Sequence, residues 1–391
     1  MPPPDFLRSC RIINFKAIRD TLSLKLTPLT VFIGNNGSGK SSVVEALRTL
    51  KVMSEMGFDA GMNLWRGVEH AYHKAPPPPL GSSNKDRASK RWGLSFQLRG
   101  RAAGKPAAFR LDLFPTKDRD RIHRAREWHN GKLHSDVRFD VHSRTRSSGV
   151  AALDLLPLLE QAGFGARWQF LTLVPEKMMP PVLRHSTQGR VVLREDGTNI
   201  AEYLEEIRNW EDSGGAYDAI MRTLRFVLPY LEEVRPETAS TVEKTLYLSL
   251  VEPSLIAHSA AADRKRATIP GWMMSTGTLR ALAIIAVLRH PDPPSLLVVE
   301  EIENSLDPRT LGLVMEEIRT AVKSRRTQVI LTTHSPQLLD VTKLDEVVFV
   351  KRDEGREPRF LRPADEPEAR KLASEFTLGE MLGRGLFGQV L

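Results

Sequence analysis

The sequence has a single cysteine and no long apolar run. Cys10 alone, in 391 residues, excludes an internal disulfide and a cysteine-rich zinc site. The longest apolar candidate, 281–288, is ended by Arg289, well short of the roughly 18 apolar residues that cross a membrane. The first residues show no basic start followed by an apolar stretch, so no signal peptide is evident. We therefore expect a cytoplasmic protein with no membrane partner.

Acidic residues are sparse where the chain is most basic. Residues 99–146 contain 13 Lys and Arg against 6 Asp and Glu, an excess of seven, in a chain of net charge +8. This excess indicates a surface for a polyanion such as DNA or RNA. It is equally typical of a solvated loop, because arginine-rich loops are common and few aromatic residues are interleaved here. The composition leaves both interpretations open.

The most specific motif is a complete phosphate-binding loop. An apolar run at 29–33 predicts a buried strand before it, and residues 41–47 predict a helix after it. Its glycines allow backbone N–H groups to surround phosphates at the positive end of that helix. Lys40 suits the β- and γ-phosphates, and Ser41 suits Mg²⁺. The residues expected to bind ATP are Gly34, Asn35, Asn36, Gly37, Ser38, Gly39, Lys40, Ser41 and Ser42.

Two carboxylates follow a second apolar strand, 295–299. Such a strand delivers acids beside the phosphate loop, at its carboxyl end. We expect Glu300 to hold Mg²⁺, directly or through water, and Glu301 to accept a proton from the attacking water. Adjacent residues of a strand point to opposite sides, so the two acids cannot share a role unless the strand ends there.

Two further segments extend the nucleotide machinery. The apolar strand 328–333 is followed by His334, which comes 33 positions after Glu301 with a predicted helix between them. This spacing fits the next parallel strand of a β-α-β unit, and a neutral imidazole there can bond a γ-phosphate oxygen and the attacking water. Residues 274–280 open another helix, whose Ser, Thr and Gly present N–H groups as a second anion site.

In this order, these motifs resemble those of ABC-type ATPases. The similarity is to the RecF, SMC and OLD (overcoming lysogenization defect) group, and specifically to stand-alone OLD-like "AAA family" ATPases. The basic middle of the chain is not covered by the resemblance. The stretches that carry it are 14–18, 196–199, 274–280, 300–308 and 378–390.

The resemblance implies an α/β fold, an ABC-ATPase core of the P-loop class with an antiparallel β edge and an inserted helical or mixed lid. We expect an N-terminal lobe at 1–115, the lid and basic segment at 116–239, and a C-terminal lobe at 240–391. The C-terminal lobe carries residues 274–280, which resemble the family's signature motif, together with the two acids and the histidine. The implied ligands are ATP and Mg²⁺. Lys16 matches a basic position that approaches the nucleotide in relatives.

The resemblance also implies a homodimer, or a higher oligomer, that closes head to head around two ATP molecules. Ser275 and Gly277 of one protomer would cap the γ-phosphate held by Lys40 of the other. The chain departs from the family pattern in several places. Glu300 stands for a usual Asp, and Thr276 for an acid, which alters the charge of the cap. No clear glutamine loop is found, since the candidate Gln97 falls in a predicted strand.

Several functions fit such a chain. A transporter ATPase subunit is disfavoured because 235 positions separate Lys40 from Ser275, and an SMC-like head because that interval lacks heptads. Only 57 residues follow His334, too few for the nuclease domain of OLD proteins, so we expect a separate nuclease or effector partner. One hypothesis is an ATP-hydrolysing switch acting on or with DNA, in repair or antiviral defence. The other is an ATP-dependent regulatory scaffold with little turnover.

Overall fold

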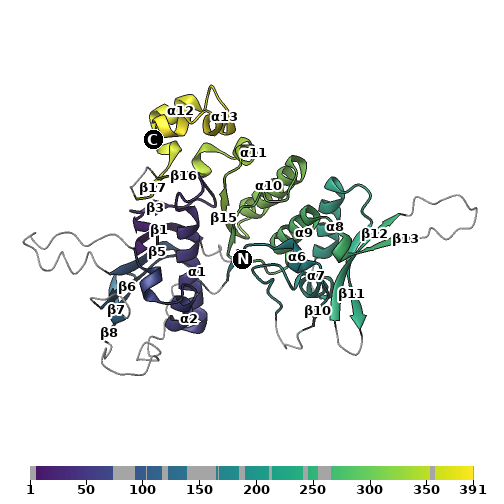
Figure 1. Ribbon diagram of the computed structural model, residues 1–391, viewed down its shortest axis with the longest axis horizontal. Helices are drawn as coiled ribbons and strands as arrows, with labels where there is room; N and C mark the ends of the chain where they lie inside the picture. Colours follow the sequence, from purple (N-terminus) through teal and green to yellow (C-terminus); the bar gives the residue numbers. More distant parts are fainter. Residues whose placement is uncertain are drawn as a thin grey trace, which may run out of the picture. The chain divides into compact units, whose positions relative to one another are not determined.

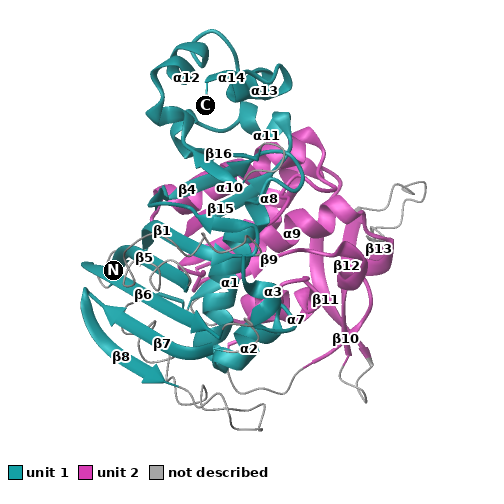
Figure 2. Cartoon of the chain, turned by 60° about the vertical axis from the view of Figure 1, so that its left-hand side comes forward, with its two compact units in different colours: residues 1–168, 330–391 teal, residues 169–329 magenta. Residues whose placement is uncertain are grey.

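The computed structural model divides into two units of dense internal contacts (Figure 2). Unit 1 comprises Met1–Trp168 and Ile330–Leu391, and unit 2 comprises Gln169–Val329. Among the described residues, no helix has the length and apolarity needed to cross a bilayer. The structure describes residues 6–73, 93–102, 104–116, 122–138, 164–165, 167–184, 190–210, 214–240, 245–253, 266–352 and 357–390.

Unit 1 contains a seven-stranded antiparallel sheet in the order β2-β1-β5-β6-β7-β8, with β3 paired to β1 and β8 at one edge (Figures 1 and 2). Apolar residues alternate with polar ones along β5 and β6, so one face of the sheet is buried. The basic segment is therefore largely sheet where it is described. The strands are β1 (Phe6–Phe15), β2 (Ile18–Asp20), β3 (Leu24–Lys25), β5 (Leu94–Ala102), β6 (Lys105–Pro115), β7 (Ile122–His129) and β8 (Lys132–Arg138).

A second sheet of unit 1 carries the phosphate loop. The strand before the loop, β4 (Leu29–Ile33), is buried at every position and pairs in parallel with β16 (Val347–Lys351), which pairs with β17 (Arg359–Leu361). The end of β15 (Gln328–Thr333) follows β4 in the strand order. The accompanying helices are α1 (Lys40–Met56), α2 (Phe58–Asn63), α3 (Val68–Ala71), α11 (Pro336–Asp340), α12 (Pro367–Leu372), α13 (Leu378–Gly383) and α14 (Leu386–Val390).

The C-terminal residues belong to the same hydrophobic core as the strand before the loop. Ile33 and Val347 of the sheet cluster with Leu378, Met381 and Phe387. These C-terminal helices are short, so their stability comes from this packing rather than from helix propensity. The core thus fixes the C-terminal segment beside the phosphate loop.

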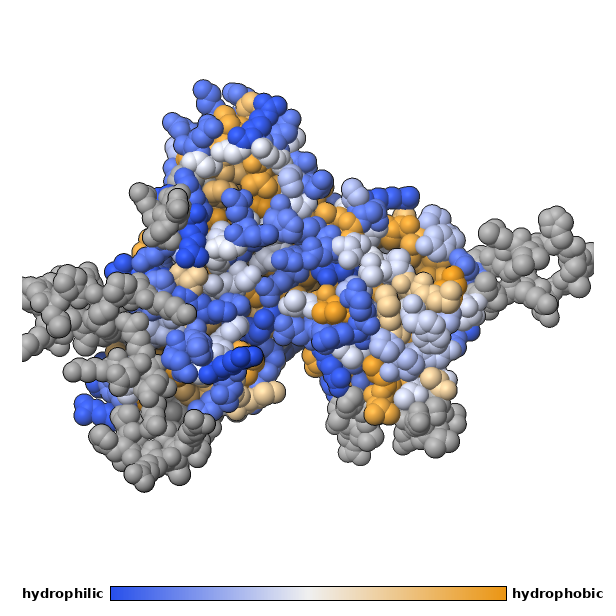
Figure 3. Space-filling view, in the orientation of Figure 1, coloured by the Kyte–Doolittle hydropathy of each residue, from blue (hydrophilic) through white to orange (hydrophobic). Residues whose placement is uncertain are grey.

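Unit 2 is built around α9 (Thr276–Arg289), which is apolar on all sides and almost wholly buried. It packs against α6 (Pro175–Met178), α8 (Ala216–Val227) and α10 (Pro308–Lys323). The other described elements are α7 (Ile200–Asn209), β9 (Trp168–Leu171), β14 (Leu296–Val299), and a four-stranded sheet of β10 (Val182–Leu183), β11 (Glu233–Ser240), β12 (Thr245–Pro253) and β13 (Arg266–Pro270). In the view of Figure 3, apolar residues of the described surface form separate groups among hydrophilic ones.

The domain boundaries expected at 115 and 239 remain predictions, and so does the inserted lid between them. Strands β7 and β8 fall inside the predicted inserted segment, yet they extend the antiparallel sheet that begins with β1. The register of β6 with β7, for example Asp112 opposite Arg126, joins residues on either side of position 115.

Candidate functional site

The phosphate loop connects β4 to α1, as its sequence predicts. Gly37 and Gly39 have φ of 72° and 108°, which L-residues with side chains rarely adopt. A Cβ at Gly34 would lie 2.3 Å from the Val350 carbonyl oxygen, and one at Gly39 would lie 2.8 Å from Pro358 Cγ. The loop is therefore held closely against the segments around β16 and β17, where only glycine fits.

The side chains of the loop suit an anion. Lys40 is the first residue of α1, and its Nζ donates to the carbonyl oxygens of Gly34 at 2.6 Å and Asn35 at 3.0 Å. Among the described residues, the buried Ser38 hydroxyl has no hydrogen-bond partner. Ser41 is exposed at the start of the helix. An ammonium group, a buried hydroxyl and the helix N-terminus together fit the phosphates of a nucleotide.

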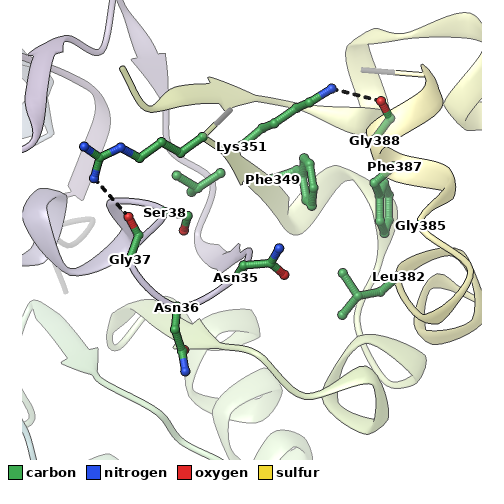
Figure 4. Close-up of a pocket in the computed structure, with 12 residues that line it drawn as sticks. Asn35, Asn36, Gly37, Ser38, Phe349, Lys351, Leu382, Gly385, Phe387 and Gly388 are labelled. Atoms are coloured by element: carbon green, nitrogen blue, oxygen red, sulfur yellow. Dashed lines mark hydrogen bonds between the residues drawn. The ribbon is translucent and has the colours of Figure 1, made fainter. Parts of the chain in front are cut away.

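A cavity of about 560 Å³ adjoins this loop within unit 1 (Figure 4). Arg352 donates to the Gly37 carbonyl oxygen at 3.2 Å, and Lys351 donates to that of Gly388 at 2.9 Å. The rings of Phe349 and Phe387 are stacked, with centroids 5.4 Å apart. The end of β16 thus bonds to both the phosphate loop and the C-terminal helix, a link for which the sequence offered no signal.

Lys16 lies in a conformation that its motif alone did not reveal. Its φ is 48°, its Nζ lies 2.7 Å from Glu45 Oε2, and the same Nζ lies 3.8 Å from the centroid of the Trp65 ring. The ion pair between Lys16 and Glu45 connects the turn after β1 to α1, the helix that follows the phosphate loop. That Lys16 approaches the nucleotide remains a prediction. A nucleotide at this position would compete with the Glu45 carboxylate for the Lys16 ammonium group.

His334 directly follows β15, as predicted, and its side chain is exposed. The next residue, Ser335, caps α11: its hydroxyl accepts from the Leu338 N–H at 3.4 Å, and its own N–H donates to Thr333 Oγ1 at 2.9 Å. These bonds fix the backbone on both sides of His334. Because β15 and β4 are neighbours in the strand order, His334 and the phosphate loop belong to adjacent strands of unit 1.

The two predicted acids follow β14 in unit 2. The strand ends at Val299, so the alternation of a strand does not apply to Glu300 and Glu301. The Glu300 carboxylate is 3.4 Å from the Thr172 hydroxyl, and Asn304 Nδ2 donates to Glu301 Oε2 at 2.6 Å. Glu301 has φ of 47°, a conformation that costs a non-glycine residue about 1 kcal/mol or more and that clusters at functional sites.

Arg280 is a buried member of this group whose contacts the sequence did not predict. Its Nη1 donates to the Leu173 carbonyl oxygen at 2.8 Å, and its Nη2 donates to that of Glu301 at 2.9 Å. Burial lowers the pKa of the guanidinium below its ordinary value. A charged residue inside the apolar run of 279–288 was the one available signal, because such a charge is rarely buried without partners.

The signature residues occupy the start of α9. Ser275 is exposed, and its hydroxyl accepts from the Thr278 N–H at 3.1 Å, which makes it the N-cap. A Cβ at Gly277 would lie 2.5 Å from the Ser305 carbonyl oxygen, so the helix approaches this backbone where only glycine fits. Asp307 caps α10 by accepting from the N–H groups of Arg309 and Thr310.

The side chains that could hold Mg²⁺ are a hydroxyl and a carboxylate. No cluster of three or more His, Cys, Asp or Glu side chains suited to a metal occurs among the residues that the structure describes. Mg²⁺ bound with a nucleotide needs only a hydroxyl and a carboxylate from the protein, because phosphate and water supply the rest. Ser41 and Glu300 have the required chemistry.

Fold and motifs together define an ATPase head with the ABC-type fold, similar in sequence to an OLD protein and in fold to SMC heads. The chain belongs to the family described as "AAA domain, putative AbiEii toxin, Type IV TA system", whose profile matches residues 29–340. It is also similar to the "OLD nuclease" of Thermus scotoductus (strain ATCC 700910 / SA-01). The two are 22% identical over 394 residues, which cover 95% of this chain and 67% of that protein.

Solved structures of SMC heads share the fold. An SMC head bound to the C-winged helix domain of ScpA aligns with a TM-score of 0.56 at 16% identity, covering 91% of this chain and 97% of that one. A Pyrococcus furiosus Smc head with an extended coiled coil, bound to the C-terminal domain of ScpA, gives a TM-score of 0.55 at 15% identity, covering 95% and 99%. These likenesses establish a mixed α/β ABC-ATPase fold with an antiparallel sheet, which confirms the predicted fold class.

Proposed function

We propose that this protein binds ATP with Mg²⁺ and hydrolyses it. The observation that carries the proposal is the phosphate loop, where Lys40 donates to the loop carbonyl oxygens and the buried Ser38 hydroxyl finds no hydrogen-bond partner among the residues that the structure describes. A γ-phosphate offers Lys40 a charged acceptor, which binds an ammonium more strongly than a neutral carbonyl does. Ser41 and Glu300 would hold Mg²⁺, which would supply positive charge to neutralise the phosphates.

The chain's own groups would divide the remaining work. Glu301 would accept the proton of the attacking water, and the His334 imidazole would orient that water by a hydrogen bond. Asn304 donates to Oε2 of the Glu301 carboxylate at 2.6 Å, a bond that orients this carboxylate. Ser275 and Gly277 of a second copy would complete the site by presenting the start of α9 to the γ-phosphate.

We further propose that the ATP-dependent closure of two copies drives a switch that acts on or with DNA. The basic residues of 99–146 and the nuclease named among the relatives support this role. Repair or antiviral defence, with a separate nuclease or effector protein, is the biological setting that we favour. Neither the oligomer nor the partner is needed for the loop to bind ATP, so these parts can be tested separately.

The alternative is a regulatory scaffold that binds ATP and turns it over slowly. The 2.6 Å bond from Asn304 favours it, because this bond engages one oxygen of the carboxylate that would have to accept the proton of the attacking water. Steady-state ATP hydrolysis, measured with and without DNA at several salt concentrations, separates the two. Turnover that DNA stimulates supports the switch. A slow rate that DNA does not change, together with retained ATP binding, supports the scaffold.

A further inference from the structure

The antiparallel sheet of unit 1 presents a face rich in arginine. Its buried face carries residues such as Phe96, Leu98 and Leu111. On the opposite face, strand register aligns Arg11 with Gln97, Gln97 with Arg110, and Arg110 with Trp128. We call this surface the arginine face. Its arginines are Arg11, Arg99, Arg101, Arg110, Arg124, Arg126 and Arg138, and its acids are Asp20, Asp112 and Asp136. Lys25, opposite Ser9, lies on the same face and pairs with Asp365.

The three acids orient arginines rather than neutralise the surface. Arg11, Arg110 and Arg124 each form a bidentate pair through Nε and Nη2, with Asp20, Asp112 and Asp136 respectively, at 2.6–3.0 Å. This geometry directs Nη1 of each guanidinium away from its carboxylate. The seven arginines outnumber the three aspartates by four on one face of one sheet.

Aromatic rings lie among these cations. The Arg110 guanidinium stands 4.7 Å from the centroid of the Trp128 ring, and the Arg126 guanidinium stands 5.6 Å from that of Phe114. Both rings are partly exposed. Stacked guanidinium and aromatic planes accept unpaired bases, whereas the bases of a duplex already stack on each other. A face that only contacts water is stabilised by charged side chains and gains nothing from aromatic rings placed beside them.

We propose that the arginine face binds single-stranded nucleic acid, with its phosphates on the arginines and its bases on the Arg110–Trp128 and Arg126–Phe114 stacks. The inference deepens the proposed function, on which its nucleic-acid partner rests. The ladder from Arg11 to Trp128 crosses four strands, roughly 14 Å at the usual strand spacing, which suits two or three nucleotides of an extended strand. A duplex bound through its backbone alone is the competing outcome.

The test is fluorescence anisotropy of a labelled 30-nucleotide single strand and of the matching duplex, with the full chain. The variants are Arg99→Glu with Arg138→Glu, which reverses two exposed charges, and Trp128→Leu, which removes one stacking plane. The matched control is Arg370→Glu with Lys371→Glu, two exposed cations of α12 in the same unit. Circular dichroism melting shows whether each variant is folded.

We expect the charge reversal to weaken single-strand binding more than tenfold and to flatten its salt dependence, by about 0.7 in log–log slope for each lost phosphate contact. Trp128→Leu should weaken it roughly tenfold, and the control should bind normally. Unchanged binding by both variants overturns the assignment of this face. Equal duplex binding that ignores Trp128 makes it a backbone site instead. If the unaltered chain hydrolyses ATP but binds no nucleic acid, the inference fails while the ATPase assignment stands.

Discussion

Arg280 holds the backbone of Glu301 in place by donating Nη2 to its carbonyl oxygen at 2.9 Å. The same guanidinium bonds the Leu173 carbonyl oxygen, so one buried side chain of α9 fixes two chain segments. Glu301 is kept at φ of 47° in this setting. The signature helix and the acid proposed as proton acceptor are therefore mechanically linked within unit 2.

Replacing Arg280 should uncouple this link. In Arg280→Lys one amine cannot reach both carbonyls in the same geometry, so we expect a loss of about 1–3 kcal/mol in the free energy of unfolding. We also expect a lower kcat with little change in ATP affinity, because Arg280 positions Glu301. Urea unfolding and hydrolysis kinetics measure the two effects. Arg222→Lys, on the exposed side of α8, is the control, and equal kcat values for both variants would rule the link out.

Lys40→Ala removes the ammonium group of the phosphate loop. We expect ATP affinity, measured by titration calorimetry, to fall roughly 100-fold, because a charge-assisted bond to phosphate is lost. Lys51→Ala is the matched control, since Lys51 lies in the same helix and pairs only with Glu55 among the contacts that the structure gives. Normal ATP affinity in Lys40→Ala would refute the loop assignment.

Glu301→Gln keeps the shape of the side chain and removes its basicity. We expect ATP binding to persist while turnover falls about 10²- to 10⁴-fold. The variant should also accumulate ATP-bound dimers, seen by light scattering with Mg-ATP. Glu316→Gln, exposed on α10, should hydrolyse ATP at the normal rate. A Glu301→Gln protein that stays monomeric with Mg-ATP would contradict the proposed dimer closed around two ATP molecules.

Ser275→Arg places a long cation at the start of α9. The dimer would bring this position to a neighbouring active site, so we expect loss of ATP-dependent dimers with nucleotide binding by the monomer retained. The lost N-cap alone should cost only about 1 kcal/mol of stability. Ser374→Arg, at an exposed position of unit 1, controls for the added charge. Normal dimers of Ser275→Arg, by sedimentation, would place the interface elsewhere.

Burial raises the pKa of Glu127 from 4.5 to about 7. The folded state therefore binds its proton more tightly than the unfolded state does. This stabilisation is complete below pH 4.5 and is lost as pH rises to about 7, at most about 3 kcal/mol. Urea unfolding of Glu127→Gln at about pH 5 and about pH 8 should show a smaller pH dependence than the unaltered chain. Equal pH dependence would mean that the carboxyl group is solvated.

Short sequence motifs were enough to predict the features that depend only on residues close together along the chain. Glycine spacing around Lys40 determines the loop, and an apolar run followed by Glu300 determines the end of a strand. Ser275 was predictable as a helix start because capping uses the N–H groups two or three residues later. The alternation at 92–98 and 108–114 predicted a strand pair, which β5 and β6 confirm. The loop interpretation of the basic segment was wrong over β7 and β8, where alternation within an arginine-rich sequence was too weak a signal to identify the sheet.

The sequence by itself determined the phosphate loop, the order of the motifs and the class of fold, because each depends on spacing along the chain. Only the tertiary structure decided which distant groups meet. Lys16 pairs with Glu45, Gly277 lies against Ser305, and Arg280 bonds Glu301. Such contacts depend on how helices and strands pack. The same holds for the arginine face, since strand register alone places arginines from five strands on one surface.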